Sequence, residues 1–387
     1  ETGGVANVAL PSAHDNSEYT VMSYRSYAGA PLTGYTAEAF GYPQTYMAND
    51  ILALQTLYGA DFTTHSENTV YSWSSTTGQQ FINGVAQLAP GSGTGGSSNR
   101  IFETVWDGNG VDTYDFSNYT TALTVNLNPG AFSITSATQL AYLGNGHYAS
   151  GNIFNAYLFN GDVRSYIDNA IGGSGNDTIT GNAIANTLIG GGGNDTLNGG
   201  AGDDRLVGGA GFDTLTGGSG ADTFVFAFGD SSAASGQHDL ITDFSTGADH
   251  IDLSAIDAIA GGSYDLFRFI GSSAFSGTAG ELNYSYNSAL GVTTLQGDTN
   301  GDRFADFVID IRGNIAISIG DLINAYLASV SAVVIESFGS TKLDSIGSNF
   351  YLDAVSSGSA TGPSLKWSGA DFYTGELGGW TPIGVEK

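Results

Sequence analysis

Large apolar residues recur at every ninth position between Gly172 and Val225. Six nonapeptides follow one another there without a gap, and their eighth places are filled by Ile179, Leu188, Leu197, Leu206, Leu215 and Phe224. Each lies in the middle of a three-residue run, which predicts a short strand whose central side chain points inward, since successive side chains alternate between faces. Such a sustained period indicates a solenoid. We expect two nonapeptides per coil of a flattened helix, so that each turn stacks on the turn two repeats away.

The polar places of the repeat predict a metal-binding turn. Glycines allow the positive φ angles of a tight turn and let backbone carbonyls converge, and an acidic residue in the sixth place adds the carboxylate oxygen that Ca²⁺ prefers. Asn186 fills that place in the repeat 181–189, where we expect weaker binding. The expected ligands are Gly173, Gly175, Asp177, Gly191, Gly193, Asp195, Gly200, Gly202, Asp204, Gly209, Gly211, Asp213, Gly218, Gly220 and Asp222. A flexible Gly-rich linker is the alternative, but linkers do not keep an apolar residue in register.

The charge of the chain agrees with calcium binding. Its 38 acidic and 10 basic residues give a formal net charge of −28 over 387 residues. Such an excess repels nucleic acid and anionic membranes, and we expect neither as a partner. There are no cysteines, so calcium rather than disulfides is expected to staple the fold. No apolar run is long enough to span a membrane, and the first residues lack the features of a signal peptide.

Two segments near the N-terminus carry a specific resemblance. Val21-Met22-Ser23-Tyr24 is followed by a predicted helix over 49–59, Asn-Asp-Ile-Leu-Ala-Leu-Gln-Thr-Leu-Tyr-Gly, with a cap at Asn49 or Asp50 and one apolar face. Together with the nonapeptides, these segments resemble serralysin-type secreted zinc metalloproteases, a metzincin family. The resemblance implies that Met22 is the Met-turn residue beneath a zinc ion and that Tyr24 ligates zinc or stabilises the oxyanion.

The zinc motif of that family is missing from this sequence. No His-Glu-x-x-His occurs, and the five histidines stand far apart. Without that helix the chain has neither the zinc ligands nor the general base of the family. His14 has two interpretations, a substitute zinc ligand or an ordinary polar histidine in a loop. We therefore expect zinc only together with an upstream segment, and no activity from this chain alone.

Three further segments are candidate calcium sites. Asp107, Asn109 and Asp112 resemble the first calcium site of the family, with a plain hairpin turn as the alternative. Asp298, Asn300, Asp302 and Asp306 open like an EF-hand loop, although Ile309 stands where that loop carries Glu; a bare turn is the alternative. The acidic residues of segment 238–254 either cap the last coil with calcium or are simply solvated.

The expected fold class is mainly β, a parallel β-roll flanked by β-sandwich-like strands, with a small α-containing remnant of a metzincin catalytic domain. The expected divisions are that remnant at 1–60, a β-rich lead-in at 61–171, the roll at 172–230, a serralysin-like β segment at 231–325, and part of a tryptophan-rich module at 326–387. Short runs at 69–73, 100–106 and 123–127 have strand composition.

Two functions remain open from the sequence. The first is the C-terminal portion of a secreted zinc metalloendopeptidase that acts on protein or peptide substrates, leaves a bacterial cell by type I secretion and folds on extracellular calcium. The second is a non-catalytic extracellular structural or adhesive protein, or a processed fragment, without a zinc site. A sugar-active enzyme on a β-helix is a third reading, but no pair of carboxylates identifies it.

Overall fold

The computed structural model describes residues 10–90, 99–234, 236–259, 261 and 264–327, and the backbone of four strands between 333 and 365. Its contacts divide the chain into two units. The first comprises Glu1–Ile256, Tyr284–Gln296 and Ala305–Ile323, and the second comprises Asp257–Asn283, Gly297–Phe304 and Asn324–Lys387. The described helices include none that is long and apolar enough to cross a membrane.

The first unit contains a ten-stranded sheet that runs through the repeats. Its hydrogen-bonded order is β24-β19-β17-β15-β13-β11-β5-β1-β2-β3, parallel from β24 to β1 and antiparallel at β2 and β3. In chain order the strands are β1 (Val70–Trp73), β2 (Gln80–Ile82), β3 (Val85–Ala86), β5 (Thr113–Asp115), β11 (Asn169–Ile171), β13 (Thr187–Gly192), β15 (Arg205–Ala210), β17 (Thr223–Ala227), β19 (His250–Ala255) and β24 (Leu322–Ile323).

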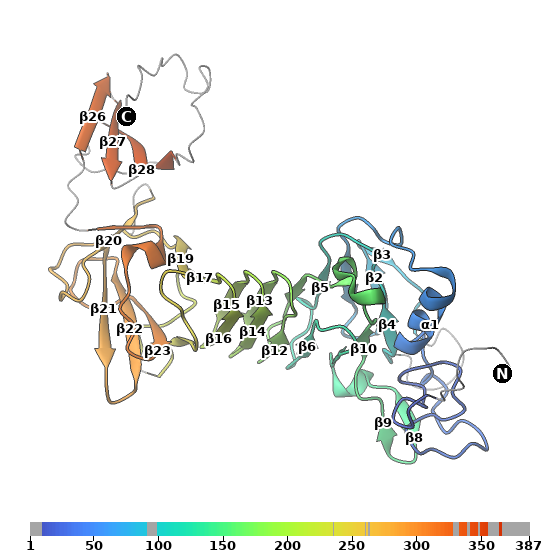
Figure 1. Ribbon diagram of the computed structural model, residues 1–387. Helices are drawn as coiled ribbons and strands as arrows, with labels where there is room; N and C mark the ends of the chain where they lie inside the picture. The colour runs from blue at the N-terminus through green and yellow to red at the C-terminus, as the bar shows by residue number, and fades with distance from the viewer. Residues whose placement is uncertain are drawn as a thin grey trace. The chain divides into compact units, whose positions relative to one another are not determined.

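A second parallel sheet lies across the roll from the first (Figure 1). Its order within this unit is β23-β18-β16-β14-β12-β6. The strands are β6 (Thr124–Asn126), β12 (Thr178–Thr180), β14 (Thr196–Ala201), β16 (Thr214–Ser219), β18 (Asp239–Ile241) and β23 (Phe307–Arg312). Leu188 pairs with Leu206 and Leu197 with Leu215, a register of two repeats per coil. The expected β-roll is confirmed.

The interior of the roll is a single column of side chains from each sheet. The six residues in the eighth places of the repeats are all 0% exposed, as the alternation of strand side chains requires. The flanking strands β5, β6 and β11 continue these same sheets on the N-terminal side. There the interior widens into an aromatic cluster of Tyr71, Trp73, Tyr114, Phe116 and Tyr119, each no more than 1% exposed.

The rest of the lead-in packs beside this cluster. Strand β10 (Ile153–Asn155) pairs with β4 (Glu103–Val105) and β7 (Phe132–Ser133), and β8 (Tyr142–Gly144) pairs with β9 (His147–Tyr148). The short 3₁₀ helices are η1 (Ala137–Gln139), η2 (Phe159–Gly161), η3 (Val163–Ser165) and, near the end of the unit, η4 (Ile319–Asp321). The strands expected near 69–73, 100–106 and 123–127 correspond to β1, β4 and β6.

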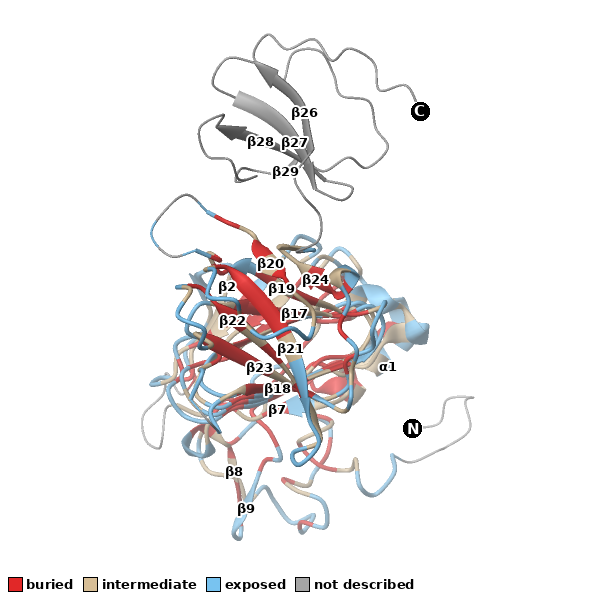
Figure 2. Cartoon of the chain, turned by 90° about the vertical axis from the view of Figure 1, so that its left-hand side faces the viewer, coloured by how far each residue is buried: buried red, intermediate tan, exposed pale blue. Residues whose placement is uncertain are grey.

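Helix α1 spans Ala48–Tyr58 and ends at Gly59, as the sequence predicts. Its cap differs from the expectation, because the N-cap is Met47 and Asp50 accepts a hydrogen bond from the Met47 amide at 3.0 Å. The predicted apolar face is largely in solvent, with Leu57 73% and Tyr58 83% exposed (Figure 2). The side that contacts the rest of the unit is instead polar, since Asp50 binds the Thr20 hydroxyl and the Val21 amide.

In the second unit, strand β20 (Phe267–Phe269) pairs in parallel with β25 (Ala325–Leu327) and with the start of β21 (Glu281–Asn287). Strand β22 spans Val292–Asp298, of which the residues up to Gln296 belong to the first unit. An antiparallel meander follows, formed by β26 (Val333–Phe338), β27 (Thr341–Ile346), β28 (Asn349–Ala354) and β29 (Ser364–Leu365). The predicted tryptophan-rich module falls here, and its tryptophans lie outside the described residues.

Candidate metal centre

The candidate metal ligands are distributed along the roll. Among the described residues, no group of three or more His, Asp or Glu side chains gathers as if around one ion. Each centre in the roll must therefore combine one or two carboxylates with backbone carbonyl oxygens, which is the ligand set that a hard, oxygen-seeking cation accepts.

The aspartates in the sixth places form a hydrogen-bonded ladder. The amide of Asp177 donates to Oδ1 of Asp195 at 2.7 Å, and the amide of Asp195 donates to Oδ1 of Asp213 at 2.7 Å. On the other side of the roll, the amide of Asp204 donates to Oδ1 of Asp222 at 2.9 Å. One oxygen of each carboxylate thus binds the coil before it, which fixes the direction of the other oxygen.

That other oxygen is buried and unpartnered. Within the described part of the chain, Oδ2 of Asp195, Asp204, Asp213 and Asp222 accepts no hydrogen bond. Burial, together with neighbouring carboxylates, raises the pKa of Asp195 and Asp204 to about 7. An ionised carboxylate oxygen without a partner is costly in such surroundings, so the ladder in this form calls for a cation or a proton.

Glycines leave the space in which a cation fits. Gly191 and Gly193 have φ angles of 106° and 105°, which an L side chain rarely adopts. A Cβ atom at Gly190 would collide with Oδ2 of Asp195 and lie 2.6 Å from the carbonyl oxygen of Gly208. A carboxylate oxygen and a carbonyl oxygen of the next coil therefore converge at this glycine. The same convergence recurs at Gly199. These residues fit calcium.

The ladder extends past the last nonapeptide into segment 238–254, where the sequence left open whether the acidic residues cap the last coil or are solvated; Asp239 and Asp249 are buried. Oδ1 of Asp239 accepts from the Asp213 amide at 2.8 Å, its Oδ2 is unpartnered among the described residues, and burial raises its pKa to about 8. Asp249 accepts from the Asp222 amide through Oδ1 and from the Ser245 amide through Oδ2. Segment 231–238 interrupts the nine-residue spacing. The remaining signal is an Asp at the first position of a strand, Asp239, or directly before one, Asp249.

The first repeat differs from the later ones. Oδ1 of Asp177 accepts from the Leu123 amide at 2.8 Å, and its Oδ2 accepts from the Gly173 amide at 2.7 Å. Gly173 and Gly175, unlike their counterparts from the third repeat on, do not have positive φ angles. The predicted ligands of this turn are thus brought together, but the turn is closed by its own amides.

In the lead-in, Asp107 and Asp112 are buried side by side, whereas the Asn109 side chain is exposed. Asp107 accepts from the Tyr71 hydroxyl at 2.7 Å, and Oδ1 of Asp112 accepts from the Thr69 amide at 2.9 Å. Oδ2 of Asp112 has no hydrogen-bond partner among the described residues, and burial together with Asp107 raises the pKa of Asp112 to about 8. Two buried carboxylates with an orphaned oxygen again fit a cation.

The loop that opens at Asp298 is closed on itself. Oδ1 of Asp298 accepts from the Gly301 amide at 2.6 Å and Oδ2 from the Arg303 amide at 3.0 Å. Asn300 and Asp302 are exposed and accept from the Asp302 and Phe304 amides, while Asp306 belongs to the first unit. These hydrogen bonds are of the kind found in a turn, and calcium binding at this loop stays a prediction.

The residues implied in zinc chemistry lie at the surface. Met22 is 74% exposed and Tyr24 is 73% exposed, on an irregular segment held by bonds such as that from the Tyr35 hydroxyl to the Ser23 carbonyl. Several described histidines have separate partners: His14 stacks on Tyr19, His147 stacks on Tyr27, and His238 contacts Asp310. The described residues therefore bring no zinc ligands together.

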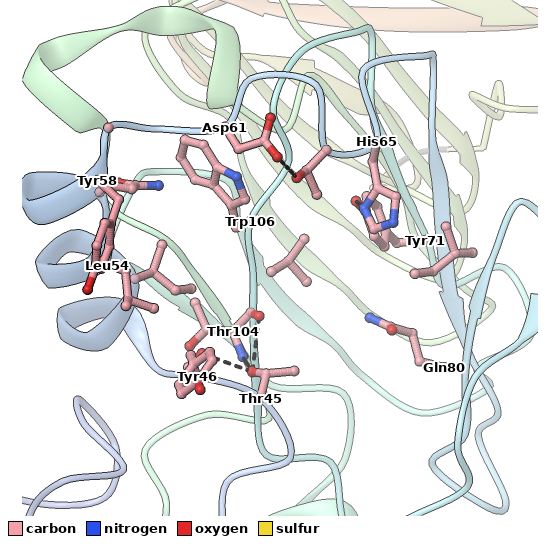
Figure 3. Close-up of a pocket in the computed structure, with 16 residues that line it drawn as sticks. Thr45, Tyr46, Leu54, Tyr58, Asp61, His65, Tyr71, Gln80, Thr104 and Trp106 are labelled. Atoms are coloured by element: carbon pink, nitrogen blue, oxygen red, sulfur yellow. Dashed lines mark hydrogen bonds between the residues drawn. The ribbon is translucent and has the colours of Figure 1, made fainter.

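A pocket of about 470 Å³ opens between α1 and strands β1, β2 and β4. Its walls include Leu54, Tyr58 and Trp106 on one side and His65 and Tyr71 on the other (Figure 3). The Tyr71 hydroxyl lies 3.0 Å from Nδ1 of His65 and also donates to Asp107. The pocket therefore touches the candidate site in the lead-in through Tyr71.

Comparison with known proteins agrees with these features. Residues 60–324 match the family model for the peptidase M10 serralysin C terminal. Metalloprotease AprA of Pseudomonas entomophila is 41% identical over 307 residues, covering 79% of this chain and 55% of the relative. Serralysin of Proteus mirabilis is 40% identical over 316 residues, covering 78% and 54%. The chain thus spans about half the length of these relatives.

A solved structure also resembles part of the chain. The AlgE6R2 subunit of the Azotobacter vinelandii mannuronan C5-epimerase is 32% identical, with a TM-score of 0.28 over 38% of this chain and 89% of that one; a likeness this weak carries no argument. The family match covers most of the chain, including the lead-in, the roll and the segment after it. The chain belongs to the peptidase M10 serralysin C-terminal family.

Proposed function

We propose that this chain is the calcium-folded C-terminal part of a secreted, serralysin-like zinc metalloendopeptidase. The observation that carries the calcium part is the ladder of buried aspartates, each with one oxygen tied to the neighbouring coil and, from Asp195 to Asp239, one oxygen unpartnered among the described residues. Family membership supports the proteolytic part. It favours this function over a non-catalytic structural or adhesive protein.

In this proposal the roll is a switch between two states of the chain. Calcium, when bound, supplies the positive charge that neutralises the facing carboxylates. Asp195, Asp204, Asp213, Asp222 and Asp239 would hold the ions together with carbonyl oxygens of the intervening turns, and Asp107 with Asp112 would hold a further one. At the low calcium concentration inside a cell these carboxylates repel one another, which keeps the roll unfolded and suited to export by a type I route.

The proteolytic part of the proposal goes further than the contacts seen among the described residues. Met22 and Tyr24 would lie at the floor of a zinc site whose histidine ligands come from an upstream segment, and protein or peptide chains would be the substrates. The proposal includes the domain boundaries expected from the sequence, after residues 60, 171, 230 and 325. The exposure of Met22 and Tyr24 leaves both free to contact such a segment.

Two measurements test the two parts separately. For calcium, circular dichroism and thermal unfolding of the chain are compared in chelator and in millimolar CaCl₂; unchanged spectra and midpoints would overturn the calcium part. For proteolysis, the protein secreted by its native host is analysed by intact mass, zinc content and activity on casein. A longer species with His-Glu-x-x-His and about one zinc ion per molecule is expected. A zinc-free, inert protein that begins at Glu1 would overturn the proteolytic part.

A further inference from the structure

The second nonapeptide, residues 181–189, departs from the others at three places. Ile184 stands in the fourth place, where the other five repeats have Gly, and the residues of the other two places face each other. Asn182 stands in the second place, where the other five repeats have Gly, and Asn186 stands in the sixth, where they have Asp. Both side chains are buried, at 4% and 2% exposure. A buried amide must find both donors and acceptors or cost free energy.

The amide nitrogens of these two residues point at backbone carbonyls. Nδ2 of Asn186 donates to the carbonyl oxygen of Asp168 at 2.8 Å. Nδ2 of Asn182 donates to the carbonyl oxygens of Ile167 at 2.8 Å and Leu127 at 3.3 Å. Three carbonyl oxygens therefore converge on neutral N–H groups.

The amide oxygens are satisfied as well. Oδ1 of Asn186 accepts a hydrogen bond from the backbone amide of Asn182 at 2.7 Å. Oδ1 of Asn182 accepts from the backbone amide of Ile184 and from Nδ2 of Asn186, each at 3.1 Å. In the next four repeats the corresponding aspartates keep one oxygen without a partner among the described residues. The pair Asn182–Asn186, which we call the amide rung, thus closes its turn without any charge to neutralise.

The amide rung joins the roll to the part of the unit with an ordinary hydrophobic core. Strand β11 pairs with β5, and β12 pairs with β6, next to the aromatic cluster around Trp73 and Tyr114. Beyond the rung each nonapeptide buries one large side chain in its eighth place, and only the last adds a second, Val225. So small a core does not hold a chain folded without a further crosslink such as a bound metal. The rung stands at the border between these two kinds of structure.

We propose that the amide rung keeps residues 169–189 folded without calcium, so that this first coil forms a template on which residues 190–225 fold when calcium binds. This rests on the proposed calcium-dependent folding of the roll. It adds a direction: the roll grows from its N-terminal end, where β11 and β12 already present paired strand edges. Asp177, whose two oxygens both accept backbone amides, belongs to the template.

Hydrogen exchange of the full chain, followed by mass spectrometry, tests this inference. In chelator, peptides from 169–189 are expected to exchange about tenfold or more slowly than peptides from 190–225, and millimolar CaCl₂ should slow only the latter. Equal, fast exchange of both segments in chelator, with both slowed by calcium, would overturn the template and leave the proposed function standing. If calcium changes neither segment, the proposed function itself fails.

The variant Asn186→Asp tests the role of the amide. It removes the donor to the Asp168 carbonyl and places a carboxylate there, so residues 169–189 should lose their protection in chelator and regain it in calcium. Asn198→Asp, the same change at an exposed position of the neighbouring repeat, is the matched control and should leave that protection unchanged. Unaltered protection of Asn186→Asp in chelator would overturn the proposal. The comparison within the unsubstituted chain decides it even if this variant fails to fold.

Discussion

The backbone amide of Asp195 donates to Oδ1 of Asp213, 2.7 Å away and one coil further along the roll, while Oδ2 of Asp213 accepts nothing from the described chain. Backbone pairing therefore uses one carboxylate oxygen and presents the other to a cation. The carboxylates proposed to bind calcium also accept the backbone amides of the preceding coil, so loss of calcium should unfold residues 190–225.

Removal of one ladder charge should have opposite effects with and without calcium. Asp204→Asn keeps an oxygen for the Asn186 amide but replaces the unpartnered carboxylate oxygen by an amide. In chelator the roll of the variant should be less unfolded than that of the unsubstituted chain, because a buried charge is gone. In millimolar calcium it should be less stable by about 1–3 kcal/mol, because a charged ligand is gone.

The control for this prediction is Asp203→Asn, a neighbouring exposed position. It removes the same charge without touching the buried oxygen, so it should change stability little in either buffer. Circular dichroism measures the folded fraction in chelator, and thermal unfolding followed by circular dichroism measures the midpoint in calcium. A shift of the same sign in both buffers for Asp204→Asn would contradict the assignment of its carboxylate as a ligand.

Stability should depend on pH in opposite directions with and without calcium. Burial raises the pKa of Asp195 to about 7 and that of Asp239 to about 8, whereas an unfolded Asp titrates near 4. The calcium-free folded state therefore holds more protons between these values, and its free energy of unfolding falls as the pH rises from about 4 to about 8.

With calcium bound the carboxylates are ionised in the folded state, so acid should destabilise the roll by releasing the ions. Both slopes are measured at pH 5 and pH 8, from the folded fraction by circular dichroism in resin-treated buffer and from the unfolding midpoint in millimolar CaCl₂. A calcium-free protein that is more stable at pH 8 than at pH 5 would rule out this account of the ladder.

Glu103 should destabilise the lead-in at alkaline pH. Its Oε1 accepts from Nε1 of Trp73 at 2.6 Å and from Nε2 of Gln80 at 2.8 Å, and burial raises its pKa to about 7. Glu103→Gln keeps an acceptor for both donors and never ionises. It should match the unsubstituted chain at pH 5 and exceed its stability at pH 8 by about 1–3 kcal/mol. Equal stability at both pH values would show that the carboxyl is not held neutral.

Truncation of one inward-pointing side chain of the roll should strongly destabilise it. Leu197 is 0% exposed and its strand neighbours are the equivalent residues of the coils on either side. Leu197→Ala should cost about 2–5 kcal/mol in calcium, measured by chemical denaturation. Leu290→Ala, at a position 71% exposed in the same unit, is the control and should cost little.

The roll itself was predictable because its information is local. Nine residues specify one turn and one strand, and the inward position of Leu188 or Leu206 follows from alternation alone. Helix α1 was predictable in extent, yet its buried side was not. Leu57 and Tyr58 suggested a core face, whereas Asp50 is the residue that binds the irregular segment at Thr20 and Val21, a contact about thirty residues away that no local pattern encodes.

The candidate ligands, like the elements of the fold, were predictable only where they depend on local sequence. The sequence by itself determined a calcium-type turn, its period and its acidic place, because each depends on residues within one nonapeptide. Only the tertiary structure decided which oxygens are left over: Asp195 keeps one unpartnered among the described residues, Asp177 keeps none, and Asp239 joins the ladder from outside the repeats. The physical reason is that hydrogen bonds between coils join residues eighteen or more positions apart, so the neighbouring coil determines whether an oxygen meets an amide or remains for an ion.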